Sequence, residues 1–211
     1  VEESEIEEGY VKIIVTRGSD DHNFTIPARS ALQPNVLVYG KPIDLNAIEK
    51  VQSGVNCITL DDDRGHHCDI LSLNQLNNMM ARAEAQKKNC YDAVFIKDGL
   101  LTEASHSNVC IVKAGVIWTP ATNEHMIRGV TRSLVLTRAA PSAGVTSIDE
   151  ASEPVRFEDM MTAEEVFLTN SQDGIIPVLS IDGNPIGGGK VGDVTKKIQE
   201  HYAHLMEDGL P

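Results

Sequence analysis

Apolar and β-branched residues gather in short runs along the chain, and these runs predict strands joined by tight turns. Residues 10–16 (YVKIIVT), 36–39 and 55–60 each have the composition of a strand. Farther on, Lys-Asp-Gly at residues 97–99 and Lys-Ala-Gly at residues 113–115 each separate two apolar runs. Glycine tolerates the positive φ that such hairpin turns require. We therefore expect two hairpins in tandem and a mixed or antiparallel sheet.

Helices are predicted where apolar residues recur at intervals of three and four. Leu73, Leu76, Met80 and Ala83 have this spacing, which places them on one face of a helix. Two further helices are expected over residues 129–140 and 191–205. Additional strands are expected at residues 145–148, 166–169 and 176–181. This succession of elements predicts an α/β fold (α+β with a mixed sheet).

The chain is expected to consist of one main domain and part of another. Over residues 36–211 the predicted elements form a single α/β domain. Residues 1–35 contain an acidic N-terminal segment, one strand and a loop rich in Gly, Asp, Asn and Pro. We expect this first strand to belong to a smaller N-terminal domain whose remainder is missing.

Charge and cysteine usage make several classes of protein unlikely candidates. The 211 residues include 18 Lys and Arg against 31 Asp and Glu, a net charge of −13, and an acidic chain repels nucleic-acid phosphates. No apolar run reaches the length of about 18 residues that a membrane span needs, and the acidic start lacks the features of a signal peptide. The four cysteines form no CxxC pair, which predicts reduced thiols rather than zinc ligands or disulfides. A cytoplasmic protein without a nucleic-acid or membrane partner is expected.

The candidate catalytic and ligand-binding residues lie in three segments, at positions 68–74, 101–108 and 127–132. In the third, Gly129 allows close backbone approach, and the amides that follow it, with the Thr131 hydroxyl, make an anion site suited to phosphate. Free amides occur at every helix start, so this signal is weak alone. Glu103 in the second segment is open to two interpretations. It is either a solvated hairpin end or a carboxylate that faces a heterocyclic nitrogen and keeps that ring protonated.

Taken together and in this order, the segments resemble the class IV pyridoxal-phosphate (PLP) enzymes. This family includes D-amino-acid, branched-chain and (R)-selective amine transaminases and aminodeoxychorismate lyase. Its members read D-I-K-S-L-N, T-E-G-S-S-S-N and G-I-T-R, followed by a hydroxyl-rich turn before I-x-P-V. The corresponding stretches here are residues 69–74 (DILSLN), 102–108 (TEASHSN), 129–132 (GVTR) and 169–178 (TNSQDGIIPV). The resemblance covers about residues 10–207 and implies the large domain of this fold, with PLP as cofactor.

The resemblance also implies roles for individual residues. The expected cofactor contacts are Glu103 at the pyridine nitrogen, Arg64 supporting the pocket, Ile127 on the ring, Gly129, Val130 and Thr131 at the phosphate, and Asn170 and Ser171 as a second phosphate contact. The expected substrate-pocket residues are Ser105, His106, Ser107 and Gln172. His22 lies in a loop that differs from the family, and it is expected in the pocket only because its side chain is titratable, a surface position being the alternative. The expected partners are a small-molecule amine or amino acid, a keto acid, and a second copy of the chain in a homodimer.

The sequence departs from the family pattern at its most important position. Leu71 stands where the family has the lysine that binds PLP covalently and later carries the proton, and leucine has no nucleophile and no titratable group. An engineered substitution and a natural degenerate paralogue both remain open. The family also has about eighty further residues before the first strand, the size of a small domain, and these include an arginine that grips the phosphate. Residues 18–24 lack the arginine of D-amino-acid transaminases, which disfavours that substrate class.

These observations predict a transaminase that transfers an amino group between an amine or amino acid and a keto acid, with activity impaired by Leu71 and by the missing N-terminal region. Two alternatives are a catalytically dead paralogue that binds PLP or another phosphate ligand, and an enzyme like aminodeoxychorismate lyase. A structural remnant that only dimerises is disfavoured, because it would need neither Glu103 nor the phosphate-binding helix start.

Overall fold

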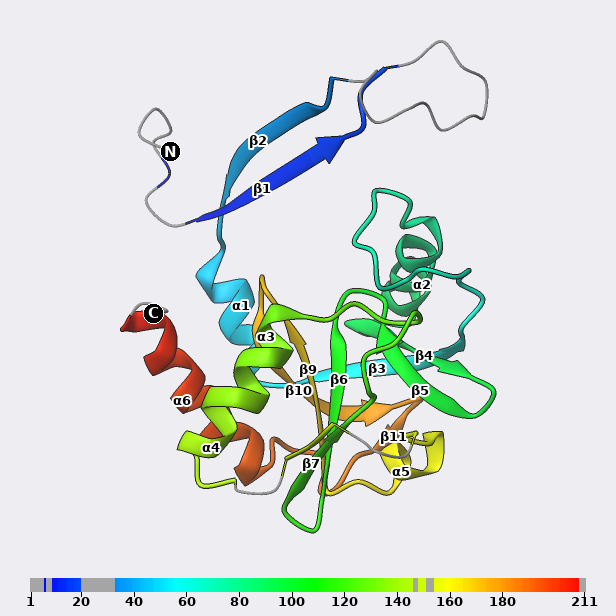
Figure 1. Cartoon of the computed structure of the whole chain (residues 1–211). Helices are drawn as coiled ribbons and strands as arrows, with labels where there is room; N and C mark the ends of the chain where they lie inside the picture. Colours follow the sequence, from blue (N-terminus) through cyan, green and yellow to red (C-terminus); the bar gives the residue numbers. More distant parts are fainter. Residues whose placement is uncertain (1–5, 7–8, 20–32, 146–147, 151–153, 209–211) are drawn as a thin grey trace. The chain divides into compact units, whose positions relative to one another are not determined.

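The computed structural model describes residues 6, 9–19, 33–145, 148–150 and 154–208, and the backbone alone over 148–150. The chain divides into two compact units, Val1–Asn46 and Ala47–Pro211 (Figure 1). Every feature of the candidate site described below lies in the larger unit. His22, one of the predicted substrate-pocket residues, lies outside the described residues.

The smaller unit contains an antiparallel hairpin of β1 (Gly9–Thr16) and β2 (Asn35–Pro42), in which Ile13 pairs with Val38 and Val15 with Val36. This pairing differs from the expectation that residues 36–39 open the larger domain. The two strands pair along their whole length, from Gly9 with Pro42 to Thr16 with Asn35. The chain therefore divides after Asn46, eleven residues beyond the expected position.

A mixed sheet forms the centre of the larger unit, as the sequence predicts. The hydrogen-bonded order of the described strands is β5-β4-β3-β10-β9-β6-β7-β8, with β11 beside β10. Their bounds are Val55–Asp61 (β3), Asp92–Lys97 (β4), Leu100–Ala104 (β5), Asn108–Lys113 (β6), Val116–Thr119 (β7), Ile148–Glu150 (β8), Glu165–Asn170 (β9), Gly174–Ile181 (β10) and Asn184–Pro185 (β11). Strand β3 is parallel to both β4 and β10, and β7 is parallel to β8, while the other pairs are antiparallel.

Both predicted hairpins are present, and their turns have the expected backbone. Asp98 and Gly99 have φ of 52° and 78° between β4 and β5, and Ala114 and Gly115 have φ of 51° and 73° between β6 and β7. Two successive positive φ angles are the signature of the tight turns that match strand twist. The local sequence was sufficient to predict these hairpins.

The sheet curls back on itself at the junction of β5 and β6. These strands are far apart in the hydrogen-bonded order, yet only residues 105–107 connect them. The Ala104 amide donates to the Ser107 carbonyl across this short connection, at 2.7 Å. The sheet must curl for its first strand to meet its sixth, and the segment with Glu103 lies where the curl closes.

Helices cover the sheet, and one of them differs from its prediction. Their bounds are Leu45–Gln52 (α1), Leu76–Lys87 (α2), Val130–Leu134 (α3), Ala140–Ser142 (α4), Phe157–Met161 (α5) and Asp193–Glu207 (α6), with a π-helical segment, Val135–Ala139, between α3 and α4. The predicted apolar face of α2 is wrong, because Leu76 and Met80 are exposed and Leu73 precedes the helix. Ala81 and Ala85 are buried instead, since small side chains let the helix approach β3 and β4 closely.

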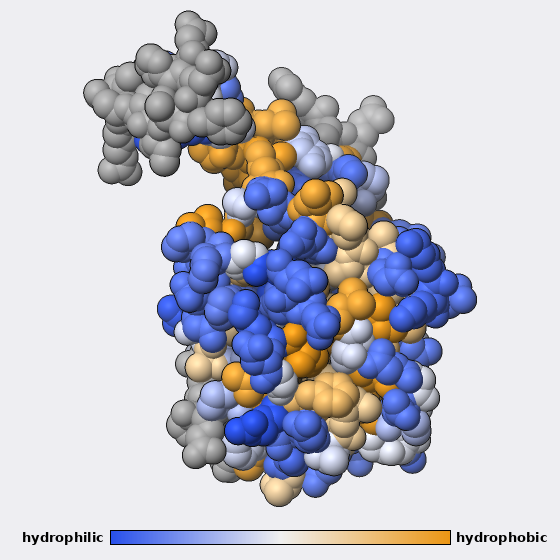
Figure 2. Space-filling model, turned by 90° about the vertical axis from the view of Figure 1, so that its right-hand side faces the viewer, coloured by the Kyte–Doolittle hydropathy of each residue, from blue (hydrophilic) through white to orange (hydrophobic). Residues whose placement is uncertain are grey.

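Alternate residues of the strands fill two layers of core on opposite faces of the sheet. Ile111 and Leu168 belong to the cluster that includes α5, whereas their neighbours Val112 and Phe167 pack with α6 and the π-helical segment. Hydrophilic residues cover much of the face that Figure 2 shows, with hydrophobic ones between them. All four cysteines are free thiols, as predicted. No helix of the described residues is long and apolar enough to cross a membrane.

Candidate functional site

A buried group of charges lies where β3 and β5 end. The guanidinium of Arg64 donates through Nε and Nη2 to the two carboxylate oxygens of Asp62, at 2.9 and 2.8 Å, and through Nη1 to Oε1 of Glu103. Arg64 also lies over the Phe95 ring, 4.3 Å from its centre. The structure thus brings Arg64 and Glu103 together, and it adds Asp62, which the sequence did not indicate.

The second carboxylate oxygen of Glu103 joins the helix-start segment to the sheet. It accepts hydrogen bonds from the Ile127 amide at 2.9 Å and from the side-chain amide of Asn108 at 3.4 Å. Asn108 also donates to the Ile127 carbonyl at 2.7 Å. Glu103 is therefore not a solvated hairpin end, and the first of the two interpretations of this residue is wrong.

Burial and charge act in opposite directions on the acids of this group. Burial raises the pKa of Glu103 to about 7, although Arg64 and the Ile127 amide favour its ionised form. Burial also disfavours the ionised form of Asp62, but its bonds to Arg64 outweigh that effect and lower its pKa. Two carboxylates share one guanidinium, so the group carries one negative charge in excess when both acids are ionised.

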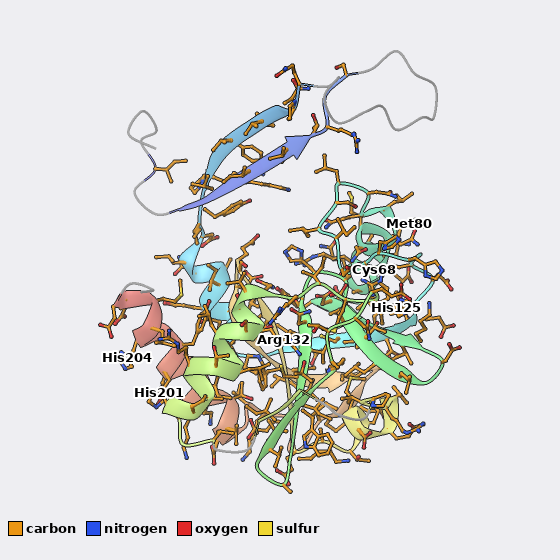
Figure 3. The ribbon with its side chains drawn as sticks, in the orientation of Figure 1. Cys68, Met80, His125, Arg132, His201 and His204 are labelled. Carbon is orange, nitrogen blue, oxygen red and sulfur yellow. The ribbon has the colours of Figure 1, made fainter. Side chains whose placement is uncertain are left out.

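This group forms part of the wall of a pocket of about 270 Å³. The lining residues include Arg64, Glu103 and Ile127, together with residues of the segment that leads into α2. Cys68 and His125 lie on this side of the larger unit, away from His201 and His204 on α6 (Figure 3). Within the described residues, no group of three or more His, Cys, Asp or Glu side chains is placed to hold a metal ion.

Leu71 lies at the edge of this region rather than in it. Its side chain is 75% exposed, while its neighbours Ile70 and Ser72 line the pocket. The segment has no regular secondary structure before α2 begins at Leu76. Position 71 is therefore accessible to solvent in this structure.

The predicted phosphate-binding helix start is α3, with Gly129 as its N-cap and no side-chain capping bond from that residue. A Cβ at position 129 would overlap Oδ1 of Asn108, so glycine is required for the close contact of these two segments. Thr131 is buried and Val130 is exposed. Asn108 therefore connects the helix start to Glu103, a role that only the fold shows.

The second predicted phosphate contact is a turn after β9. The Asn170 side-chain oxygen accepts from the backbone amides of Gln172 and Asp173, at 3.0 and 2.7 Å, which fixes the turn. Ser171 and Gln172 are exposed at its surface. The side chain of Asn170 thus shapes the turn, and its own amide group points to the sheet, where it donates to Ser107 at 3.2 Å.

The predicted substrate loop between β5 and β6 presents its three residues differently. The hydroxyls of Ser105 and Ser107 are buried and donate to the carboxylate of Asp92. His106, between them, is exposed. None of the three lines the 270 Å³ pocket. The sequence did not indicate Asp92, whose serine partners lie more than ten residues away.

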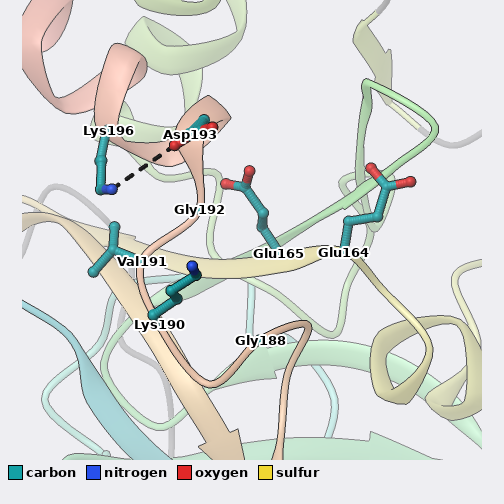
Figure 4. A pocket seen from close by; sticks show the side chains of 8 residues that line it. All are labelled: Glu164, Glu165, Gly188, Lys190, Val191, Gly192, Asp193 and Lys196. Atoms are coloured by element: carbon teal, nitrogen blue, oxygen red, sulfur yellow. Dashed lines mark ion pairs between the residues drawn. The ribbon is translucent and has the colours of Figure 1, made fainter.

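A second pocket of about 220 Å³ lies at the start of α6, where its residues stabilise the helix (Figure 4). Glu165 accepts hydrogen bonds there from the amides of Val194 and Thr195, at 3.0 and 2.8 Å, and from the Thr195 hydroxyl at 2.6 Å. A carboxylate at a helix N-terminus occupies the position that an external anion would take. Lys196, which pairs with Asp193 at 3.8 Å, lies beside it.

Comparison with known proteins is consistent with this geometry. The sequence profile of the family described as "Amino-transferase class IV" matches residues 1–181. The chain belongs to this family. It is 32% identical over 207 residues to the D-alanine aminotransferase of Staphylococcus aureus (strain N315), covering 98% of this chain and 71% of that protein. It is 38% identical over 192 residues to the D-alanine aminotransferase of Bacillus licheniformis, covering 91% of this chain and 65% of that protein.

Solved structures of class IV aminotransferases have the same fold. The branched-chain amino acid aminotransferase of Escherichia coli superposes with a TM-score of 0.79 at 24% identity, over 93% of this chain and 65% of that one. A branched-chain amino acid aminotransferase in complex with N-(5′-phosphopyridoxyl)-L-glutamate gives 0.79 at 23% identity, over 96% of this chain and 66% of that one. The chain thus spans about two thirds of the length of these class IV aminotransferases.

Proposed function

We propose that the larger unit binds PLP in the 270 Å³ pocket, and that the chain carries the binding machinery of a transaminase whose turnover Leu71 impairs. The observation that supports this most directly is the buried ion-pair group of Asp62, Arg64 and Glu103, of which Arg64 and Glu103 line the pocket. Its excess negative charge is held in a region of low solvent access, where an unpaired charge is costly. A protonated ring nitrogen beside Glu103 would offset that cost.

The residues of this chain fit the cofactor. Glu103 has acceptor capacity left, since an ionised carboxylate offers about four lone-pair sites. Ile127 is the apolar residue for the ring face. The phosphate would extend from this pocket to the amides of the α3 start, with Thr131, and to Ser171, none of which lines the pocket itself. Enzymes of class IV use PLP, and one of the similar solved structures holds a phosphopyridoxyl derivative.

The chemistry divides between the cofactor and the chain. When bound, PLP supplies an electron-poor ring that stabilises negative charge at the substrate carbon. Glu103 holds the proton on the ring nitrogen, and Arg64 keeps the carboxylate oriented. A transaminase also needs a base that removes the substrate proton and returns it, and the apolar side chain of Leu71 cannot do this. We therefore infer that binding is retained and turnover is lost or very slow.

The substrate class we propose is a small amino acid or amine with a keto acid as acceptor. The relatives named D-alanine aminotransferase make alanine the first donor to test, in both enantiomers. We further propose that the protein acts in the cytoplasm as a homodimer, without nucleic-acid or membrane partners, and that the smaller unit belongs to a small N-terminal domain. A non-catalytic PLP-binding protein is the second candidate, and the leucine at position 71 favours it.

The test restores the missing amine. Leu71→Lys, the unmodified chain and Leu73→Lys are mixed with PLP, followed by absorbance spectroscopy, borohydride reduction and mass spectrometry of peptides. Leu73→Lys is a matched control, because Leu73 is also exposed and lies in the same segment. We expect a visible absorbance band and cofactor trapped at residue 71 only in Leu71→Lys, with amino transfer from alanine to a keto acid.

The outcomes of this test separate the candidates. If Leu71→Lys traps PLP at residue 71 without amino transfer, the binding protein is favoured over the transaminase. If neither the unmodified chain nor Leu71→Lys binds PLP in equilibrium dialysis, both candidates fail. Trapping of equal amount at residue 73 in Leu73→Lys would show unspecific reaction with exposed lysines and would also count against the site.

A further inference from the structure

Asp92, at the first position of β4, is a buried carboxylate that the proposed chemistry does not use. Its side chain is inaccessible to solvent, at 0% exposure, and lies under the loop between β5 and β6. One oxygen accepts from the Ser105 hydroxyl and from the Ala93 amide at 2.8 Å, and the other accepts from the Ser107 hydroxyl at 3.3 Å. A buried acid with three donors is expected to fix the segment that supplies them.

The loop that Asp92 holds is also anchored by backbone bonds. The Ser105 amide donates to the Ala93 carbonyl at 2.8 Å, and Asn78 of α2 donates to the Ser105 carbonyl at 2.9 Å. This loop follows Glu103 by one residue and closes the curl of the sheet. Any shift of the loop is therefore transmitted to the end of β5, where the Glu103 carboxylate lies.

The hydrogen bonds have a direction that the carboxylate dictates. An ionised Asp92 can only accept, so the Ser107 hydroxyl must donate to it. The lone pairs of that hydroxyl then accept from the side-chain amide of Asn170 at 3.2 Å. The same orientation of Asn170 lets its oxygen accept from the amides of Gln172 and Asp173, while its NH₂ group also donates to the Tyr91 hydroxyl at 3.2 Å and to the Asp173 carboxylate at 3.4 Å.

We propose that Asp92 is a positioning residue, whose carboxylate orients Ser107 and Asn170 and so couples the end of β5 with Glu103 to the turn with Ser171. This inference rests on the proposed PLP site, because those are the ends of the site that hold the ring nitrogen and part of the phosphate. It assigns Ser105 and Ser107 to the support of the site and leaves His106 as the loop residue exposed to solvent.

A negative charge on Asp92 does not stabilise the fold. Burial raises the pKa of Asp92, and the bond from Ser105 offsets this only in part, so the folded state disfavours the ionised form. An amide of the same shape avoids that cost. The substituted amide also directs its NH₂ group at the Ser107 hydroxyl. That hydroxyl then faces two NH₂ donors, from position 92 and from Asn170, and its own hydrogen has no acceptor. Asp92→Asn should therefore disturb the coupling without lowering stability.

The experiment compares the unmodified chain with Asp92→Asn and with Asp182→Asn as control. Asp182 also accepts two bonds, from the amide and hydroxyl of Thr59 at 2.9 and 2.5 Å, but it is exposed and lies outside the pocket. Hydrogen exchange is measured without cofactor for peptides that cover residues 104–108 and 170–173. The dissociation constant for PLP is measured by equilibrium dialysis, and the urea midpoint by circular dichroism.

In Asp92→Asn we expect faster exchange in both segments, at least tenfold weaker PLP binding, and a urea midpoint that is unchanged or higher. Asp182→Asn should leave exchange in both segments and PLP binding unchanged. Ser107→Ala combined with Asp92→Asn should bind PLP no more weakly than Asp92→Asn alone, since both changes break the same relay.

Two results would overturn the proposal. One is exchange and PLP binding in Asp92→Asn that match the unmodified chain. The other is a urea midpoint that falls together with PLP binding, which would reduce Asp92 to an ordinary structural residue. An unmodified chain that binds no PLP would refute the proposed function instead, and the exchange measurement without cofactor would still decide whether Asp92 couples the two segments.

Discussion

Arg64 and Glu103 form a buried ion pair in which each side chain is only 5% exposed. The two residues are 39 positions apart in the sequence, and the parallel pairing of β3 with β4 and the hairpin from β4 to β5 bring them together. Arg64 occupies one oxygen of Glu103, while the Ile127 amide binds the other. The position of this carboxylate is therefore fixed from two sides, by the sheet and by the segment before α3.

Removing the charge of Glu103 should weaken cofactor binding. Glu103→Gln keeps the shape of the side chain but ends the charge-assisted contact with a ring nitrogen, worth about 1.5–3 kcal/mol. We expect PLP to bind about tenfold to a hundredfold more weakly in equilibrium dialysis. Glu164→Gln, an exposed acid in the pocket at the start of α6, is the control and should bind PLP normally. Equal affinity of both variants would argue against Glu103 as the ring partner.

Glu103 should also make the stability of the cofactor-free protein depend on pH. Its pKa in the folded protein is raised from 4.5 to about 7, so the folded state binds this proton more tightly than the unfolded state. The stabilisation is fully present below pH 4.5 and is lost as the pH rises through 7. We expect the free energy of unfolding to fall by about 2–3 kcal/mol over that interval through this group. Urea titrations at about pH 5 and about pH 7.5, on either side of the raised pKa, should show a smaller change in Glu103→Gln.

Gly129 should tolerate no side chain. The Cβ of Gly129→Ala would overlap Oδ1 of Asn108 and displace the residue that bonds Glu103 and Ile127. Such overpacking costs about 1–3 kcal/mol of unfolding free energy, and PLP binding should weaken with it. Gly65→Ala is a suitable stability control, because no atom lies within 4 Å of its Cβ position. Urea midpoints that fall equally in both variants would contradict this explanation.

Replacement of Glu165 should destabilise α6 and leave PLP binding unchanged. Glu165→Ala removes three hydrogen bonds from the first turn of that helix, and loss of such a cap costs about 1–2 kcal/mol. Hydrogen exchange should accelerate over residues 194–197, while PLP binding stays unchanged. Asp193→Ala, whose side chain is exposed and pairs with Lys196, should have a much smaller effect. Weaker PLP binding in Glu165→Ala would show that the two pockets are coupled.

The sequence was most informative where structure is local. The turns at Asp98 and Ala114 follow from the glycine after each of them, and the ordered motifs placed Glu103 and Thr131 at the ends of the elements that carry them. It was least informative where a long-range partner decides the outcome. The exposed Leu76 and Met80 have helical spacing, but burial in α2 follows the small residues that fit against β3 and β4.

The same reason explains which site residues were missed. Asp62, Asp92 and Asn108 act through contacts with residues on other strands, and an isolated acid or amide in a sequence carries no sign of such partners. A weak signal existed for Asp92, since it opens an apolar strand and charged residues are seldom buried without partners. The serines after Glu103 were predicted to line the substrate pocket, yet in the structure their hydroxyls face Asp92.

The place of β10 in the sheet has a consequence for how the protein is made. Strands β3, β4 and β5 form one half of the sheet and β6, β7 and β9 belong to the other, and β10 joins the halves although it is synthesised after both. Until residue 181 leaves the ribosome, β3 and β9 each present an open edge, and open edges pair readily with other chains. The growing polypeptide therefore depends on its last third to escape aggregation, and substitutions that slow the docking of β10 should lower the yield of folded protein before they alter the finished fold.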